Sequence, residues 1–113
     1  TSDVIDLINQ VRTRARKMVA GGTQPENLST TETSKSTIMQ WIMDERLREL
    51  AGEGQRWFDL RRWALGGTIT LNNSYFSSAT PALMKFDAEK HLNFPIPTSE
   101  TDKNPNVEQN HGY

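Results

Sequence analysis

Apolar residues recur every three or four positions over the first 20 residues, which is the spacing of an amphipathic helix. Ser2 or Asp3 can cap its first turn, and the glycine pair at 21–22 ends it. The apolar positions that define its stripe are Val4, Leu7, Ile8, Val11, Ala15, Met18 and Val19. The pattern therefore predicts a first helix with one face turned toward a core.

A second helix is predicted from about residue 36 to about residue 52, after a polar loop over residues 23–36. Ser34 and Ser36 are both suitable N-cap residues. At about 100° per residue, one apolar stripe contains Met39, Met43, Leu47 and Leu50, and a neighbouring stripe runs through Ile38, Ile42, Glu45 and Glu49. If the second stripe is buried, its two glutamates need arginine partners.

A third helical stretch covers residues 55–63 and lies between glycines that favour breaks. Gly52 and Gly54 precede it, and the glycine pair at 66–67 closes it. Residues 68–93 show no sustained period, although residues 68–71 alternate briefly like a short strand.

Prolines and turn residues fill the last 20 positions, and they predict a tail that is not helical. Four apolar residues in this tail are placed to dock on the helices: Phe94, Ile96, Val107 and Tyr113. The predicted fold class is mainly α, with two to three packed helices plus an irregular Pro-rich C-terminal tail.

Composition changes this picture in one respect. The 113 residues suit one small domain, but only 35% are hydrophobic, which is low for a self-sufficient core. We therefore expect a loosely ordered chain or a piece of a larger protein.

The net charge of −1 argues against nucleic acid or an anionic membrane as the main partner. The chain has no cysteine, no apolar run long enough to span a bilayer, and no stretch that resembles a signal peptide.

Residues 45–63 combine alternating charges with a high density of aromatic rings, and every cation among them is arginine. Arginine pairs bidentately with carboxylates and stacks on rings, which lysine does not do as well. We interpret the stretch as a partly buried ion-pair network in which Glu45, Glu49 and Asp59 pair with arginines. The candidate partners on neighbouring elements are Arg12, Arg16, Arg56 and Arg61, and the rings expected to fill the core are Trp57, Phe58 and Trp63. Glu49→Ala is then predicted to cost about 3–5 kcal/mol if the pair is buried.

Catalytic and metal sites find little support in the sequence. Carboxylates stacked along one helix do not flank a bond in a cleft, as a glycosidase requires, and nearby arginines favour their charged form. His91 and His111 lie far apart in loop-like sequence and are expected to be solvated. We predict no catalytic residue, no metal and no cofactor. Acidic residues also cancel the arginines of residues 44–62, which disfavours nucleic acid.

Sugar binding finds one pair of candidates. Tyr75 and Phe76 lie in a polar Asn/Ser loop, where a ring face can stack on the apolar face of a pyranose. Trp41, Trp57 and Trp63 are expected to pack in the core instead. Tyr75 and Phe76 are therefore the ligand-binding residues that the sequence suggests.

Three segments together resemble the SusD/RagB family of outer-membrane nutrient-binding lipoproteins. They are residues 6–15 (DLINQVRTRA), residues 44–63 (DERLRELAGEGQRWFDLRRW) and residues 94–113 (FPIPTSETDKNPNVEQNHGY), in the order that the family has. Two positions depart from it: Gly52 replaces a bulky apolar residue, and His111 replaces a proline.

The resemblance implies a non-enzymatic protein on the cell surface of a Gram-negative bacterium, anchored in the outer membrane by an N-terminal lipid that is absent from this chain. Such proteins bind glycans, or in some members peptides, and deliver them to a SusC-like TonB-dependent transporter. Residues 1–113 would be a single C-terminal segment of a larger helical SusD-like fold, without its N-terminal tetratricopeptide-like part.

Two other functions stay open at this point. The arginine and tryptophan residues of 45–63 would suit an independent helical module that binds a protein partner, because these residue types dominate interface hot spots. A carbohydrate-active enzyme would instead lose hydrolysis when Glu45 or Glu49 is changed, and we expect no turnover.

Overall fold

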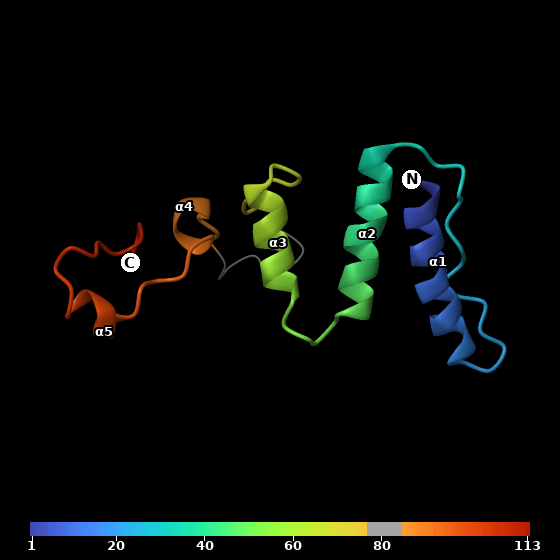
Figure 1. The fold of residues 1–113 in the computed structure, drawn as a ribbon, viewed down its shortest axis with the longest axis horizontal. Coiled ribbons are helices and arrows are strands. Elements are labelled where there is room, and N and C mark those ends of the chain that lie inside the picture. The colour runs from blue at the N-terminus through green and yellow to red at the C-terminus, as the bar shows by residue number, and fades with distance from the viewer. Residues whose placement is uncertain (77–84) are drawn as a thin grey trace. The chain divides into compact units, whose positions relative to one another are not determined.

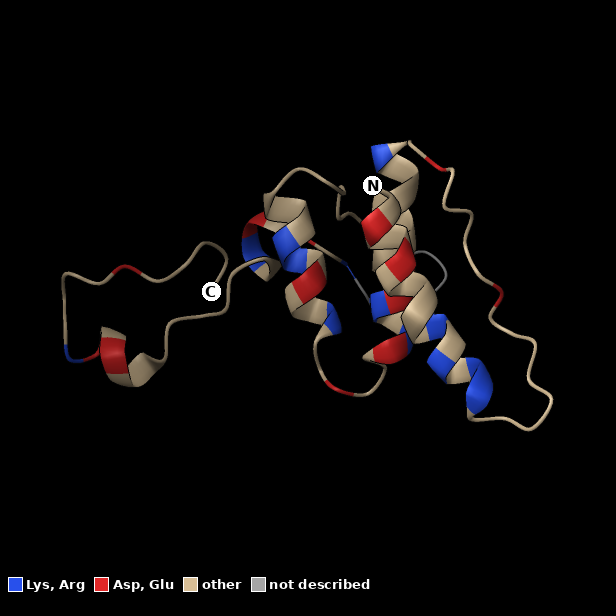
Figure 2. Ribbon diagram, turned by 45° about the vertical axis from the view of Figure 1, so that its right-hand side comes forward, with Lys and Arg blue, Asp and Glu red and all other residues tan. Residues whose placement is uncertain are grey.

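In a computed structural model, residues 1–76 and 85–113 are described, and all regular structure within these ranges is helical. The helices are α1 (Ser2–Lys17), α2 (Lys35–Glu49), α3 (Arg56–Leu65), α4 (Ala88–His91) and α5 (Thr98–Thr101) (Figure 1). The predicted mainly α fold is confirmed. Figure 2 shows both signs of charge on each of the three long helices, in agreement with the small net charge of −1.

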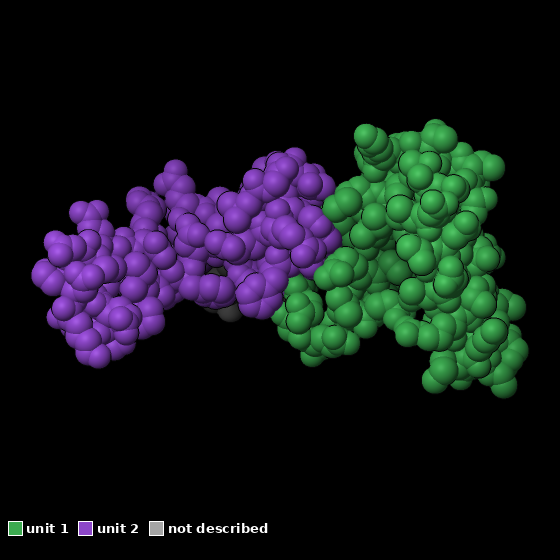
Figure 3. All heavy atoms as spheres, in the orientation of Figure 1, with its two compact units in different colours: residues 1–56 green, residues 57–113 purple. Residues whose placement is uncertain are grey.

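The chain divides into two compact units, residues 1–56 and residues 57–113 (Figure 3). The first holds α1, α2 and the connection between them. The second holds nearly all of α3, together with α4, α5 and the segments that follow each of them. No helix in the described ranges is long and apolar enough to cross a membrane.

In the first unit, α1 buries Ile8 of the predicted stripe, and it also buries Ile5, which the stripe did not include. Val4 and Leu7, which the stripe did include, are exposed, so their assignment to the buried face was wrong. The helix ends at Lys17, however, before the last two members of the predicted stripe. Met18 and Val19 are therefore exposed, and their assignment to the buried face was wrong. The N-cap residue is Thr1, and its side chain makes no capping hydrogen bond, so neither Ser2 nor Asp3 caps this helix.

Helix α2 begins where the sequence suggests, because the Ser34 hydroxyl accepts a hydrogen bond from the Thr37 N–H at 3.3 Å. It buries Ile38 and Met43, whereas Leu47 is 46% exposed and does not belong to the core. Helices α1 and α2 lie side by side and run in the same direction (Figure 1). The connection must therefore return along the full length of α1.

Three polar residues on one face of α1 hold that connection. The Asn9 side chain donates to the Leu28 carbonyl at 2.9 Å and accepts from the Leu28 N–H at 2.7 Å. Arg12 donates to the Glu26 carbonyl at 2.7 Å, and Arg16 donates to the Pro25 carbonyl and to Asn27. Asn9, Arg12 and Arg16 are spaced i, i+3 and i+7, so they project from the same side of the helix.

The predicted ion pairs of α2 are present. Glu45 is buried and accepts from Arg12 Nε at 2.9 Å and from Arg48 Nη1 at 3.3 Å. Glu49 pairs with Arg14, which is 68% exposed. Arg16, an expected partner of these glutamates, instead bonds the connection. Because the Glu49 pair is at the surface, the burial on which the predicted cost of about 3–5 kcal/mol depends is not present, and that cost does not apply to Glu49→Ala.

Helix α3 follows a turn in which Gly52 and Gly54 have φ of +85° and +73°, a backbone region that suits glycine. Asp59 is buried and pairs with Arg62 on the same helix at 2.6 Å. Trp63 is 5% exposed, as expected for a core ring, but Phe58 is 57% exposed, so its assignment to the core was wrong.

The remaining expectations need two corrections. Residues 68–71 form no strand, because the N–H groups of Thr68 and Ile69 both turn back to the Trp63 carbonyl at the end of α3. The tail does contain a helix, since Pro97 is the N-cap residue of α5 and its carbonyl accepts from the N–H groups of Glu100 and Thr101. Outside α5 the tail is irregular, as predicted, and the Gln109 side chain accepts from the Ile96 N–H and donates to the Ile96 carbonyl.

Candidate functional site

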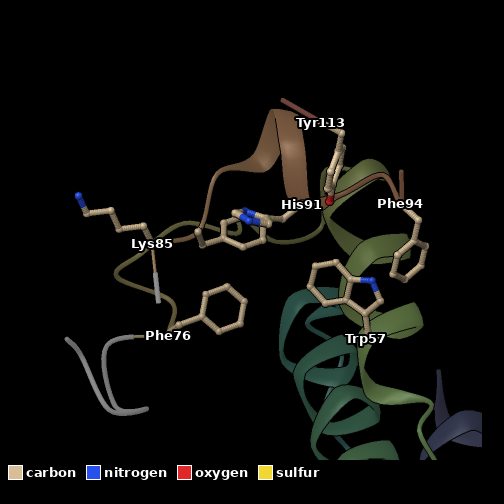
Figure 4. A pocket seen from close by; sticks show the side chains of 7 residues that line it. Trp57, Phe76, Lys85, His91, Phe94 and Tyr113 are labelled. Carbon is tan, nitrogen blue, oxygen red and sulfur yellow. The ribbon is translucent and has the colours of Figure 1, made fainter. Parts of the chain in front are cut away.

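Aromatic rings of the second unit surround a cavity of about 510 Å³, which we call the aromatic pocket (Figure 4). Its volume falls in the usual range of small-molecule sites, about 300–1,000 Å³. The residues that line it are Trp57, Phe76, Lys85, Phe86, His91, Phe94 and Tyr113. Phe94 is 61% exposed and Tyr113 is 48% exposed, so part of the ring surface is open to solvent.

Phe86 is the centre of the ring cluster. Its ring lies 6.3 Å from Trp57 in an edge-to-face arrangement, 5.2 Å from Phe76 and 5.5 Å from the His91 imidazole. Tyr75 packs edge-to-face on Phe76 at 5.3 Å. These separations are those of favourable aromatic pairs. The pocket therefore has a wall of mutually packed rings and not a set of independent side chains.

Local hydrogen bonds position the Phe86 side of this wall. The Phe86 N–H donates to Asn73 Oδ1 at 2.6 Å, which brings the segment before Phe76 beside the segment after Lys85. The next N–H, that of Asp87, donates to His91 Nδ1 at 2.8 Å. The Asp87 carboxylate caps α4 by accepting from the Glu89 N–H at 2.9 Å. His91 is thus held at the end of α4.

The opposite wall comes from the last residues of the chain. Tyr113 donates through its hydroxyl to the Asn93 carbonyl at 3.3 Å, and Lys90 Nζ lies 4.7 Å from the centre of its ring. Gly112 has φ of +84°, and a Cβ there would come within 3.0 Å of the Lys90 side chain. Arg61 of α3 donates to the Leu92 carbonyl and to Asn93 Oδ1. Asn93 is therefore bonded both by α3 and by Tyr113.

The structure brings both sequence candidates to this region. Phe76 lines the pocket, and Tyr75 is its neighbour in the ring cluster, 40% exposed. Sequence reasoning missed Trp57, Phe86, Phe94 and Tyr113 as lining residues. Trp57 was assigned to the core, yet it is half-buried and exposes part of its ring to the pocket. In the sequence, the aromatic character of these four residues is the one property that could have indicated a place in the pocket.

The two histidines differ from expectation. His91 was predicted to be a solvated loop residue, but it ends α4, accepts a hydrogen bond and lines the pocket. His111 is exposed, as expected, and lies 3.4 Å from Glu89. The predicted ion-pair residues Glu45 and Glu49 belong to the first unit and take no part in the aromatic pocket.

Comparison with known proteins identifies one matching family and two relatives. The sequence profile described as the SusD family matches residues 1–113. SusD-like protein P2 of Formosa agariphila is 31% identical over 114 aligned residues, which cover 100% of this chain and 21% of that protein. SusD-like protein P38 of the same organism is 37% identical over 62 residues, covering 54% of this chain and 12% of that protein.

The chain thus spans about a fifth of the length of the first of these curated relatives. No solved structure matches it.

Proposed function

Because the chain belongs to the SusD family, we propose that it is the C-terminal segment of a surface protein that binds glycans and delivers them to a SusC-like TonB-dependent transporter. The observation that carries this proposal is the match of the family profile to every residue of the chain. Proteins of this family are generally non-catalytic binding proteins. The proposed role is accordingly capture and transfer, without hydrolysis.

The lengths of the relatives support the segment part of the proposal. A protein of which this chain is one fifth has room for the tetratricopeptide-like helices and for the lipid anchor that would hold it at the outer-membrane surface. The first unit has the character of such a segment. Exposed leucines on both α1 and α2, at Leu7 and Leu47, remain for other parts of the protein to cover.

The aromatic pocket supports the glycan part. Sugar rings have apolar C–H faces that pack on aromatic rings, and binding sites combine such surfaces with a few polar groups. Phe76 lines the pocket and Tyr75 packs against it, so we propose both as ligand-binding residues.

The buried glutamate argues against an enzyme. Glu45 accepts hydrogen bonds from two arginines, so its carboxylate is already engaged and is not placed to donate a proton to a leaving group. We propose that the unchanged protein does not hydrolyse glycans. Variants of Glu45 and Glu49 should therefore affect its stability only.

The test uses affinity gel electrophoresis of the longer protein against a panel of plant, algal and bacterial polysaccharides, together with co-purification of its transporter. We expect retardation by at least one glycan, without release of products. Phe76→Ala should weaken that binding about tenfold, because it removes apolar ring surface on which a sugar can pack.

Phe58→Ala is the matched control, because Phe58 is 57% exposed and does not line the pocket. It should bind like the unchanged protein. Absence of retardation by every glycan, or hydrolysis of any of them, would contradict the proposed function.

A further inference from the structure

The hydrogen bonding of His91 determines which of its nitrogens carries the proton. Nδ1 accepts from the Asp87 N–H, so in the neutral ring the proton is on Nε2. The His91 backbone N–H donates in turn to the Asp87 carbonyl at 2.7 Å, so the two residues are joined by two hydrogen bonds. Because His91 lines the pocket and its Nδ1 is engaged by the Asp87 N–H, Nε2–H is the donor that this ring has for a ligand.

The rest of the lining offers ring surface and little charge. Among the described lining residues, Lys85 is the one that carries a permanent charge, and Figure 4 shows its amine directed away from the rings. A carboxylate or sulfate that entered this pocket would lose hydration among aromatic rings, because Lys85 directs its amine away from them and Lys90 Nζ lies over the Tyr113 ring. The pocket therefore disfavours acidic sugars.

An apolar ligand is disfavoured for the opposite reason. A leucine or phenylalanine side chain would cover the rings but leave His91 Nε2–H without a partner, and burying an unpaired donor is costly. A neutral sugar satisfies both features, because it has an apolar C–H face and hydroxyl oxygens at its rim.

We infer that the aromatic pocket binds one uncharged pyranose ring, stacked on the ring wall near Trp57, and that His91 Nε2–H donates a hydrogen bond to one of its hydroxyl oxygens. The inference rests on the proposed function and adds to it the place of a sugar subsite, the charge class of the sugar and the residue that orients it.

The experiment measures binding of methyl pyranosides to the longer protein by saturation-transfer NMR and by fluorescence titration, with and without the substitutions given below. The probes are the methyl glycosides of glucose, galactose, mannose and xylose, with each hexose paired with its uronic acid. At least one neutral glycoside should bind, and the matching uronic acid should bind about tenfold more weakly.

Two substitutions separate the role of His91 from a structural one. His91→Asn keeps an acceptor for the Asp87 N–H but has no donor at the position of Nε2, and it should weaken the neutral glycoside about fivefold. His111→Asn makes the same change at an exposed residue outside the lining and should leave binding unchanged. If His91→Asn alters the fold, Phe94→Ala, at an exposed lining residue, serves instead and should also weaken binding about fivefold.

Four results would overturn the inference. A uronic acid that binds as well as its neutral partner would show that Lys85 or another cation takes part, and N-acetyl-tryptophanamide binding in place of every glycoside would identify a peptide site. If polysaccharides bind but His91→Asn and Phe94→Ala leave their affinity unchanged, the subsite is wrong and the proposed function stands. If no glycan of any kind binds, both fall together.

Discussion

At the scale of single residues, Glu45 and Glu49 show how one helical turn changes the energetics of an ion pair. The Glu45 side chain is 9% exposed and meets the 10% exposed side chain of Arg12. The Glu49 side chain is 29% exposed, and its partner Arg14 is mostly in water. Removing one partner of a buried pair leaves a desolvated charge, whereas an exposed pair gives little net stability.

Glu45→Gln should therefore lower the free energy of unfolding by about 3 kcal/mol, because Arg12 keeps its bond to the Glu26 carbonyl but loses its charged partner. Glu49→Gln should cost less than about 1 kcal/mol. Urea unfolding followed by circular dichroism compares the two variants directly. Equal losses, or a larger loss for Glu49→Gln, would show that burial does not decide the strength of these pairs.

At the scale of elements, the parallel course of α1 and α2 depends on the connection between them. A chain that leaves the end of a 16-residue helix must travel about 24 Å to start a second helix beside its beginning. The connection makes this return along α1, where Asn9, Arg12 and Arg16 bond its backbone. The Asn9 amide both donates to the Leu28 carbonyl and accepts from the Leu28 N–H. In the second unit, the Gln109 amide makes the same two bonds to the backbone of Ile96.

Asn9→Asp tests this attachment. The carboxylate can still accept from the Leu28 N–H, but it cannot donate to the Leu28 carbonyl and would face that oxygen instead. We expect a loss of about 1–3 kcal/mol and faster hydrogen exchange at the Leu28 amide.

Gln10→Glu is the matched control for Asn9→Asp, since it makes the same amide-to-acid change at the next, exposed residue. Its effect should stay within about 0.5 kcal/mol. An equal effect of the two substitutions would mean that the added charge, and not the lost bond, is responsible.

At the scale of the whole molecule, the proposal that the chain is one segment of a longer protein has a consequence for its surface. In the first unit, a groove with a largely apolar lining runs between α1 and α2, where Leu7, Val11, Ile42 and Leu50 meet. Leu7 is 62% exposed. If the chain is a segment of such a longer protein, this groove would be a place for another helix of the same polypeptide to pack.

Leu7→Ser should change the stability of the 113-residue chain by no more than about 0.5 kcal/mol, but it should destabilise the longer protein by about 2 kcal/mol, because the leucine becomes buried there. Leu65→Ser is the control, at 61% exposure and outside this groove. Thermal unfolding of both proteins with both substitutions gives the comparison. If the two leucines behave alike in the longer protein, the groove is not covered by it.

The sequence by itself determined the local elements of this protein and its family. Periodicity identified the three long helices, Ser34 was among the expected caps, and the excess of arginine predicted the pairing of Glu45, Glu49 and Asp59. These features depend on residues that are close in sequence or on residue type, and both can be seen in the sequence.

The tertiary structure decided which arginine meets which glutamate, that α1 and α2 run in parallel, and that rings at positions 57, 76, 86, 94 and 113 line one pocket. Each of these joins segments that are far apart along the chain. Helical periodicity reports only which face of an element is apolar, and it carries no information about what that face meets. Tyr75 and Phe76 could be singled out from their polar loop, but the other walls of the pocket became apparent only when the chain was folded.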